Sequence, residues 1–442
     1  MRITVVGGTG YVGLTTAACL AARGHTVYCV GRNEEKIRQL LSATPIIHEE
    51  SLEELLKDVL GKDIFIPSTN LESAIRNSEV NFICVGTPSR ADGSIDLSQI
   101  EAVSKEIGLA LREVDTYKVI VVKSTVLPGT TENLVVPTIE KFSHKKAGVE
   151  FGVCMNPEFL REGRALTDFL FPKDTGIVIG ELDEKSGDVL FNIYKEFDAE
   201  ILRTNIKTAE MIKYARNSYL AKDVSFANEI ANICQKLGVD YLDVKRGMEM
   251  DARIGKDKFL NAGAGFGGSC FPKDVKALLA KSKEMGIKPR MLEATLQVND
   301  AQPYKIVELT KEVLGQLKGK RIGILGLAFK PGTDDMREAV SIKVINAFLS
   351  KGAEVFAYDP KALGNAKRIF EDKIVYKDKA EEVLTVADAC VIVTEWPQFA
   401  DLRLYNHMRS RVIIDGRRVL DPSELGSGFI YRAVGFPKAV KV

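Results

Sequence analysis

The feature that most constrains the fold is an apolar strand that runs through three spaced glycines into a helix. Met1 to Val6 is strand-like, Gly8, Gly10 and Gly13 follow in the spacing G-x-G-x-x-G, and Leu14 to Ala22 has a helical pattern. In this context the glycines allow a tight turn, a bare backbone beside a pyrophosphate and close packing of helix on strand. The chain is therefore predicted to begin with a dinucleotide-binding unit.

The end of the second predicted strand, Thr26 to Val30, bears on the choice of cofactor. Enzymes that bind NAD usually carry an acidic residue here, which holds the adenosine ribose hydroxyls. This chain reads Gly31-Arg32, which removes a negative charge and offers a cation to a 2′-phosphate. The residues leave NADP open beside NAD, and they leave open whether Arg32 stacks on the adenine.

Apolar strands alternate with helical patterns along most of the chain, as in doubly wound parallel sheets that are covered on both faces. The further strands are predicted at Val80–Val85, Val119–Lys123, Phe151–Met155, Ile177–Gly180, Arg321–Gly326, Glu354–Asp359, Ala389–Thr394 and Val412–Asp415. Between the two sets, helices are predicted from about Thr208 to Leu237 and from about Met291 to Leu314, where Pro303 would kink or divide the helix. We predict an α/β protein with two Rossmann-like doubly wound parallel sheets joined by a helical central domain.

Composition excludes several classes of function. At 442 residues the chain exceeds one ordinary core, and its 61 basic against 60 acidic residues argue against a nucleic-acid partner. No stretch approaches the length of a membrane span and the N-terminal strand does not have the layout of a signal peptide, so no membrane partner and a cytoplasmic location are expected. Four scattered histidines and no Cys/His cluster with ligand spacing predict no metal site.

One cysteine is placed differently from the rest. Cys270 lies in the glycine-rich segment Gly263–Asp274, just before a predicted helix start and three residues before Lys273. A helix N-terminus and a nearby lysine both favour the nucleophilic thiolate. The alternative is a buried cysteine in a tight loop. The other cysteines lie in apolar runs where a thiol acts as a small hydrophobe: Cys19, Cys29, Cys84, Cys154, Cys234 and Cys390.

Two pairs of polar residues four positions apart are further candidates. Lys213 and Asn217 would share one face of the central helix, and they could equally be a solvated stripe. Glu158 and Glu162 are candidate general bases, and they could equally be helix N-terminal charges after Asn156-Pro157. Thr125 follows a predicted strand, where a plain loop would explain it as well.

Taken together, the motifs resemble the nucleotide-sugar 6-dehydrogenases of the UDP-glucose/GDP-mannose dehydrogenase family, and among them the UDP-glucose 6-dehydrogenases most. The resemblance covers nearly the whole chain and rests on these segments: Gly8–Gly13, Val85–Pro88, Lys123–Val126, Pro128–Thr130, Asn156–Gly163, Ala209–Glu210, Lys213–Asn217, Asp251–Gly255, the Cys270 segment, Gly326–Lys330, Thr333–Arg337 and Asp415–Arg417. It implies three domains: 1–205 for the dinucleotide, 206–300 for dimerisation and 301–442 for the UDP-sugar. It also implies NAD as the usual cofactor and a homodimer.

The resemblance further implies a mechanism that oxidises UDP-glucose to UDP-glucuronate in two hydride transfers. Lys213, with Asn217, would stabilise the developing alkoxide, and Thr125 and Asp274 would position a water that relays the proton. Cys270 would then attack the aldehyde to give a thiohemiacetal and, after the second hydride transfer, a thioester. Glu158 would activate the hydrolytic water, with Glu162 nearer the cofactor and the substrate.

The binding residues follow from the same resemblance. On the cofactor side they are Gly8, Gly10, Tyr11, Val12, Gly13, Arg32, Lys36, Thr87, Thr125, Glu162, Lys273 and Arg337. On the substrate side they are Glu158, Phe159, Leu160, Arg161, Glu162, Lys213, Asn217, Arg253, Phe259, Leu260, Gly263, Gly267, Phe329, Lys330 and Arg417, with Arg253 expected to reach the neighbouring subunit's site. Two alternatives stay open. One is a dehydrogenase of another nucleotide sugar, such as UDP-N-acetylmannosamine or GDP-mannose, and the other is a non-catalytic dinucleotide-sensing dimer.

Overall fold

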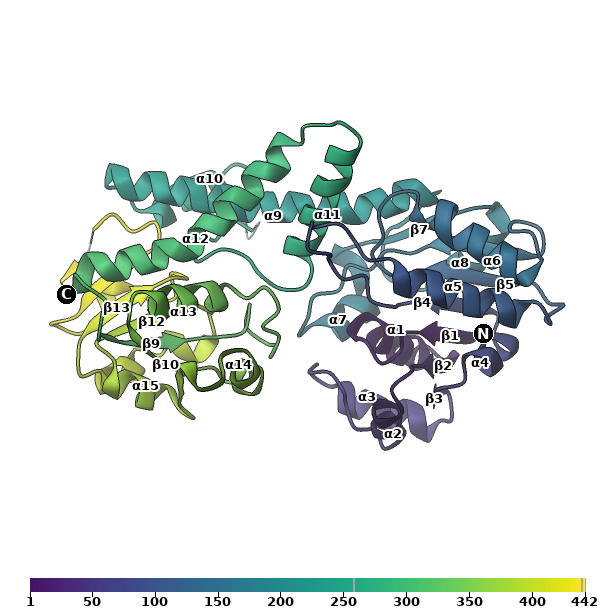
Figure 1. Cartoon of the computed structure of the whole chain (residues 1–442), viewed down its shortest axis with the longest axis horizontal. Helices are drawn as coiled ribbons and strands as arrows, with labels where there is room; N and C mark the ends of the chain where they lie inside the picture. The colour runs from purple at the N-terminus through teal and green to yellow at the C-terminus, as the bar shows by residue number, and fades with distance from the viewer. Residues whose placement is uncertain (257–258, 439, 442) are drawn as a thin grey trace. The chain divides into compact units, whose positions relative to one another are not determined.

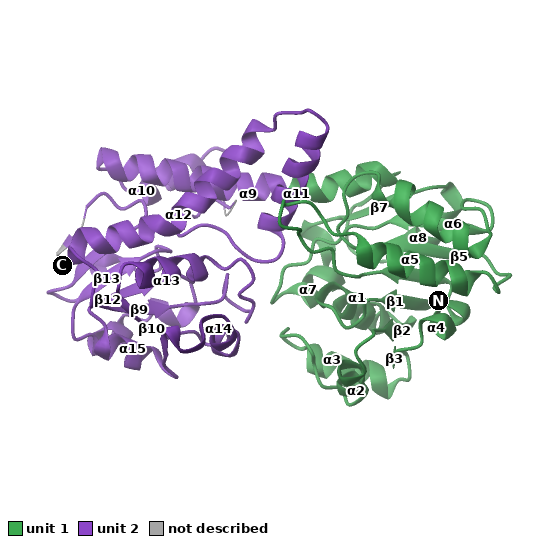
Figure 2. Ribbon diagram, viewed as in Figure 1, with its two compact units in different colours: residues 1–216 green, residues 217–442 purple. Residues whose placement is uncertain are grey.

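The computed structural model describes residues 1–256, 259–438 and 440–441. The chain forms two compact units, residues 1–216 and 217–442, which are coloured separately in Figure 2. The division between them falls inside one long helix, α9 (Ile206–Leu237). The three-domain division predicted from the sequence therefore remains a prediction.

Unit 1 is built on an eight-stranded sheet in the order β3-β2-β1-β4-β5-β6-β7-β8 (Figure 1). All neighbouring strands run parallel except β6 and β7, which pair antiparallel. The first six positions have the strand order of a Rossmann fold. The strands are β1 (Arg2–Val6), β2 (Thr26–Val30), β3 (Phe65–Ser68), β4 (Val80–Ile83), β5 (Lys118–Val122), β6 (Phe151–Met155), β7 (Ile177–Glu181) and β8 (Ile201–Asn205).

Helices cover both faces of this sheet, which explains why its inner strands are apolar throughout. One buried cluster joins the strands to α1, α2, α3, α7 and α8, and another joins them to α4, α5, α6 and the start of α9. The helices are α1 (Tyr11–Ala22), α2 (Glu34–Leu41), α3 (Leu52–Gly61), α4 (Leu71–Asn77), α5 (Ser98–Leu111), α6 (Val136–Ser143), α7 (Ala165–Leu170) and α8 (Glu184–Tyr194).

Unit 2 repeats the strand order in a seven-stranded sheet, β11-β10-β9-β12-β13-β14-β15, parallel except between β14 and β15. Two doubly wound sheets are therefore confirmed. The strands are β9 (Arg321–Leu325), β10 (Glu354–Tyr358), β11 (Val375–Tyr376), β12 (Ala389–Ile392), β13 (Val412–Asp415), β14 (Ile430–Ala433) and β15 (Val440–Lys441). The helices after α9 are α10 (Tyr241–Glu249), α11 (Phe271–Glu284), α12 (Arg290–Leu314), α13 (Val340–Ser350), α14 (Leu363–Phe370) and α15 (Ala380–Val386).

Helix α12 runs through Pro303 without a break, so the expected division there does not occur. Pro303 removes one backbone hydrogen bond. Beyond it, Ile306, Val307 and Leu309 are buried against the second sheet, and this packing holds the helix together.

Among the described residues, no helix is both long enough and apolar enough to cross a lipid bilayer.

Glycines shape the turn between β1 and α1. Gly7 adopts a φ of +85°, which L side chains rarely adopt. A Cβ atom on Gly13 would collide with the carbonyl oxygen of Gly7, so the third glycine is what lets α1 pack against this turn. The tight turn and the close packing of the helix that the spacing predicts are both present.

A buried carboxylate ties α9 to the loop that follows β5. The Glu210 oxygens accept hydrogen bonds from the backbone N–H groups of Gly129 (2.5 Å) and Thr131 (2.8 Å), at a π-helical turn before α6. Burial raises the pKa of Glu210 to about 7, against the opposing effect of these two donors. These two hydrogen bonds hold the loop that follows β5, and Thr125 belongs to this loop.

This pKa shift predicts a pH-dependent stability. The folded-state pKa lies above the unfolded value, so the folded chain binds the extra proton and its stability falls as the pH rises from about 5 to 7. In Glu210→Gln this contribution is absent. We expect the difference in free energy of unfolding between wild type and variant to change by roughly 2–3 kcal/mol across that range. Urea unfolding at several pH values measures it, and parallel pH profiles would contradict it.

Candidate active site

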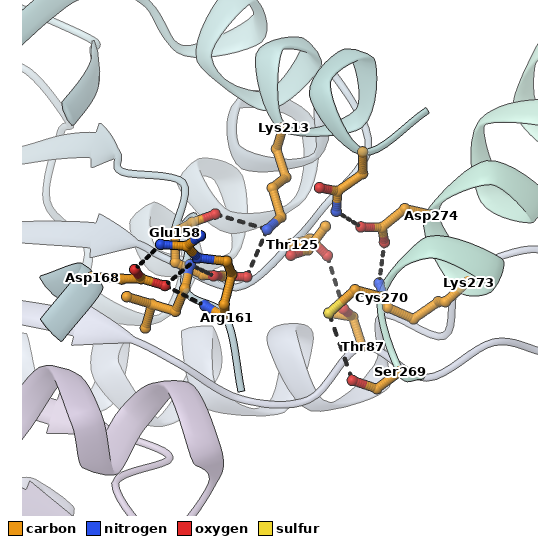
Figure 3. A network of polar contacts seen from close by, with 12 residues as sticks. Thr87, Thr125, Glu158, Arg161, Asp168, Lys213, Ser269, Cys270, Lys273 and Asp274 are labelled. Atoms are coloured by element: carbon orange, nitrogen blue, oxygen red, sulfur yellow. Dashed lines mark hydrogen bonds and ion pairs between the residues drawn. The ribbon is translucent and has the colours of Figure 1, made fainter. Parts of the chain in front are cut away.

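The predicted catalytic residues fall into two groups, one in each compact unit (Figure 3). Thr125, Glu158, Glu162 and Lys213 belong to unit 1. Asn217, Cys270 and Asp274 belong to unit 2. Lys213 and Asn217 are one turn apart on the same helix, α9, as the sequence predicted.

The centre of the first group is a buried ion pair. The Lys213 ammonium donates to the Glu158 Oε1 atom and to the Glu158 carbonyl oxygen, both at 2.7 Å (Figure 3). The side chains are 4% and 7% exposed. Burial raises the pKa of Glu158, but Lys213 and the N–H group of Leu160 outweigh it and hold the pKa below its usual range. Glu158 is thus a carboxylate at neutral pH, the form that a general base requires.

The segment that carries Glu158 and Glu162 is not helical. Residues 156–161 have no regular structure, residues 162–164 form a turn and bend, and α7 begins only at Ala165. Both carboxylates precede the helix, so the reading of them as helix N-terminal charges is wrong. The four-residue spacing does not place them on one helical face. Pro157 and the hydrogen bond from Leu160 N to Glu158 Oε2 (2.7 Å) shape this segment instead.

A second buried lysine lies next to this segment and was not among the predicted site residues. The Lys123 ammonium donates to Asn156 Oδ1 at 2.8 Å, and that oxygen also accepts from the Tyr194 hydroxyl at 2.8 Å. Burial lowers the pKa of Lys123 to about 8. The sequence offered one signal for it, a lysine that directly follows an apolar strand. Lys123 and Asn156 fix the start of the Glu158 segment against β5.

Three further predicted residues of unit 1 contact neighbouring groups, namely Thr87, Phe159 and Arg161. The Thr87 hydroxyl donates to the carbonyl oxygen of Thr125 at 2.8 Å. The Arg161 guanidinium donates to both oxygens of Asp168, at 3.0 and 2.6 Å, so the predicted substrate cation is held by an acid of the following helix, α7. Phe159 lies under Arg216, whose guanidinium carbon is 3.7 Å from the ring centroid.

In unit 2, Cys270 occupies the N-cap position of α11. The residue is partly exposed and its sulfur lies 3.6 Å from the Ser269 hydroxyl, whereas the other six cysteines are buried. The position before the helix was predicted from the sequence and is confirmed. A thiol at a helix N-terminus is biased toward the thiolate.

One turn into this helix, Asp274 links two predicted residues. Its Oδ2 atom accepts from the Asn217 amide at 2.6 Å, and its Oδ1 atom accepts from the Lys273 ammonium at 2.5 Å (Figure 3). Asp274 is 1% exposed. The carboxylate therefore fixes the Asn217 amide relative to the helix that starts at Cys270.

Three side-chain amides that the sequence analysis missed hold the glycine-rich loop before Cys270. Asn299 donates to the carbonyl oxygen of Phe266 (3.0 Å) and accepts from its N–H group (2.7 Å). Gly263 is held in the same way by Gln302 and Asn228, each over less than 3 Å. Their helices were recognised, but inward-pointing amides leave no distinctive pattern in one sequence. The loop is thus pinned through its backbone, which substitutes for the packing that glycines lack.

The same loop packs against the segments that carry the predicted substrate residues. A Cβ on Gly263 would approach Arg417, one on Gly267 would collide with the Glu338 backbone, and one on Gly268 would meet the ring of Phe329. These close approaches require glycine. The structure therefore brings Gly263, Gly267, Phe329 and Arg417 together within unit 2.

The remaining predicted residues of unit 2 have the following surroundings. Leu260 is buried, and its carbonyl oxygen accepts from the Tyr241 hydroxyl. Phe259 is partly exposed beside Phe271. Arg253 is exposed and paired with Asp251, and Arg337 is paired with Asp335. The Lys330 ammonium lies 5.7 Å from the Phe329 ring.

Unit 1 contains a cavity of about 290 Å³ at the carboxyl ends of its central strands. Gly7, Gly10 and Gly31 line it without side chains, and the first-turn N–H groups of α1 at Tyr11, Val12 and Gly13 have no partner within the helix. Bare backbone and helix N-terminal donors suit a pyrophosphate, so the residues fit a dinucleotide. Gly8 packs against β2 beneath this turn.

Two predicted cofactor residues differ in their position. Arg32 lines the cavity, while Lys36 is exposed on α2. The Tyr11 hydroxyl accepts from the N–H group of Gly163 at 3.0 Å, which connects α1 to the Glu162 segment.

Within the described part of the chain, no group of three or more His, Cys, Asp or Glu side chains is arranged to hold a metal ion.

Comparison with known proteins accounts for almost the whole chain. Three family models match in order: the NAD-binding domain of the UDP-glucose/GDP-mannose dehydrogenase family at residues 1–198, its central domain at 207–301 and its UDP-binding domain at 323–422. The order is that of the two sheets and the helices between them.

Individual relatives and a solved structure point to the same family. UDP-glucose 6-dehydrogenase AglM of Haloferax volcanii is 42% identical over 96% of this chain and 98% of its own. GDP-mannose 6-dehydrogenase of Pseudomonas aeruginosa is 40% identical over 91% of this chain and 93% of its own. The structure of a UDP-glucose dehydrogenase from Pyrobaculum islandicum matches with a TM-score of 0.92 and 38% identity over 98% and 97% of the two chains. The chain therefore belongs to the UDP-glucose/GDP-mannose dehydrogenase family.

Proposed function

We propose that this protein is an NAD-dependent UDP-glucose 6-dehydrogenase, which oxidises UDP-glucose to UDP-glucuronate. The observation that carries the proposal is Cys270 at the N-cap of α11, partly exposed in a backbone-pinned glycine loop beside the Asn217–Asp274–Lys273 network. A protein that only binds dinucleotides has no use for such a thiol. NAD, when bound, accepts the hydride in each oxidation.

The first oxidation removes a proton and a hydride from the C6 alcohol. In the proposal, the Lys213 ammonium and the Asn217 amide stabilise the developing alkoxide, and a water held by Thr125 and Asp274 takes the proton. The support for this assignment is the placement of Lys213 and Asn217 on successive turns of α9 and their bonds to Glu158 and Asp274. These bonds orient both donors.

The second oxidation and the hydrolysis depend on Cys270 and Glu158. The thiolate adds to the aldehyde, the thiohemiacetal loses a hydride and a proton, and the resulting thioester is cleaved by water to carboxylate and free thiol. Glu158 deprotonates this water, and its lowered pKa supports that role. Glu162 is assigned to contacts with the cofactor and the substrate.

The substrate end is assigned to unit 2. Lys330 and Arg417, with Arg253 of a second copy, are proposed to neutralise the diphosphate. Phe259, Leu260, Gly263, Gly267 and Phe329 line the sugar and uracil side, a role supported by the packing of the glycine loop on Arg417 and Phe329. Phe159, Leu160 and Arg161 are assigned to the sugar side from unit 1. Lys273 and Arg337 are assigned to the cofactor.

A homodimer is part of the proposal. Three large apolar side chains of α9, namely Tyr219, Phe226 and Ile233, are 62%, 46% and 47% exposed at intervals of seven residues, which places them on one helix face. A face of this kind favours packing against a second copy. We also propose a cytoplasmic location, since all seven cysteines are unpaired, as a reducing compartment favours.

A second candidate substrate is another nucleotide sugar, GDP-mannose first, because a GDP-mannose 6-dehydrogenase is almost as similar as the UDP-glucose enzymes. The test offers a panel of nucleotide sugars with NAD and counts reduced cofactor per sugar consumed. We expect UDP-glucose to give the highest kcat/KM and two NADH for each UDP-glucuronate. A higher kcat/KM with GDP-mannose would show that GDP-mannose is the substrate in place of UDP-glucose. One NADH per sugar would refute the four-electron reaction.

The covalent role of Cys270 predicts the behaviour of Cys270→Ser. A serine hydroxyl is a much weaker nucleophile than a thiolate, so net formation of the carboxylate should be abolished while NADH binding is retained. Cys234→Ala, which alters a buried thiol of α9, is the matched control and should keep its turnover. Unchanged turnover in the serine variant would remove the covalent mechanism.

The role of Lys213 predicts that Lys213→Ala lowers kcat by about 100-fold or more, because a charge beside the alkoxide is lost. Lys207→Ala is the control, since Lys207 is exposed on the same helix and pairs with Glu132. Stopped-flow measurement of the first hydride transfer distinguishes lost chemistry from lost substrate binding. An unaltered rate in the Lys213 variant would contradict the assignment.

A further inference from the structure

Helix α5 contributes to the lining of the cavity assigned to the dinucleotide. Gln99, Val103 and Glu106 line it at intervals of four and three residues, so they share one face of that helix. Gly31 and Arg32, just after the carboxyl end of β2, also line the cavity. In a Rossmann fold this end of the second strand lies next to the adenosine ribose.

Position 31 cannot carry the acid that usually binds the ribose. A Cβ atom on Gly31 would collide with the side chain of Thr9, which fills the space. Thr9 belongs to the turn between β1 and α1 and is β-branched, so it has little freedom to move away. Any carboxylate on this part of the cavity wall has to come from another element.

Glu106 supplies one. Its Oε1 atom accepts a hydrogen bond from Arg32 Nη2 at 2.6 Å, and both residues line the cavity. The pair compensates the charge of the cation that would otherwise favour a 2′-phosphate. It also leaves a carboxylate where the additional phosphate of NADP would bring about two further negative charges.

We infer that Glu106 is the residue that makes this enzyme select NAD over NADP. It binds the Arg32 guanidinium, so this pair leaves no net positive charge for a 2′-phosphate at the ribose end of the cavity. Without it, Arg32 becomes a bidentate donor for a 2′-phosphate. The inference rests on the assignment of this cavity to the adenosine half of the cofactor, and it does not depend on which sugar is oxidised.

The test measures dissociation constants of NADH and NADPH by fluorescence titration of the full-length protein without sugar, so a wrong substrate assignment does not affect the result. Wild type should bind NADH more tightly. Glu106→Gln, which removes the charge and keeps the shape, should shift the ratio of the constants toward NADPH by about 10-fold or more. The pair is exposed on both sides, 69% and 44%, and such pairs contribute little to stability, so the variant should fold.

Two further variants test whether the shift in the ratio depends on the position of Glu106 and on Arg32. Glu101→Gln changes another glutamate of α5 that does not line the cavity, and it should leave the ratio unchanged. Adding Arg32→Ala to Glu106→Gln should cancel the gain in NADPH affinity. A wild-type preference for NADPH, an unchanged ratio in Glu106→Gln, or a gain that persists without Arg32 would each overturn the inference.

Discussion

The buried ion pair between Lys213 and Glu158 is the interaction on which the rest of the candidate site depends. Removing two charges from water costs several kcal/mol per ion, so the pair persists only because each partner has further hydrogen bonds. Lys213 also bonds the Glu158 carbonyl oxygen, and Leu160 N bonds the Glu158 carboxylate. The pair keeps the carboxylate ionised in an apolar setting and fixes the ammonium at one point of α9.

Polar side chains of α9 bind two loops of unit 1 and one helix of unit 2. Glu210, Lys213 and Asn217 follow one another at helical spacing, and they bind the loop after β5, the segment after β6 and the first turn of α11 respectively. Within unit 1, Glu210 and Lys213 thus hold two loops to the first turns of α9, and within unit 2 Asn217 holds α9 to α11. The glycine loop before Cys270 follows the same logic, since Asn299, Gln302 and Asn228 hold its backbone from α12 and α9.

Most of the fold was predictable from the sequence, because the strands that form each sheet are continuously apolar and the fingerprint fixes the first turn. Short or polar strands such as β8 and β11 were missed, since they bury little and leave no periodic signal. The position of Cys270 just before a helix was also predictable. The partner of Arg32 was not, because Glu106 lies 74 positions away in a helix with an ordinary surface pattern.

The two doubly wound sheets, the dinucleotide turn and the placement of a cysteine before a helix follow from the amino-acid order alone, because they depend on local periodicity and on backbone conformations that only glycine allows. Which charges neutralise each other became visible only in the folded chain. The structure showed that Glu158 precedes a helix and is held ionised by Lys213, that three amides pin the cysteine loop, and that Glu106 faces Arg32. Electrostatic pairing and burial depend on distances between segments remote in the chain, and no single segment encodes those distances.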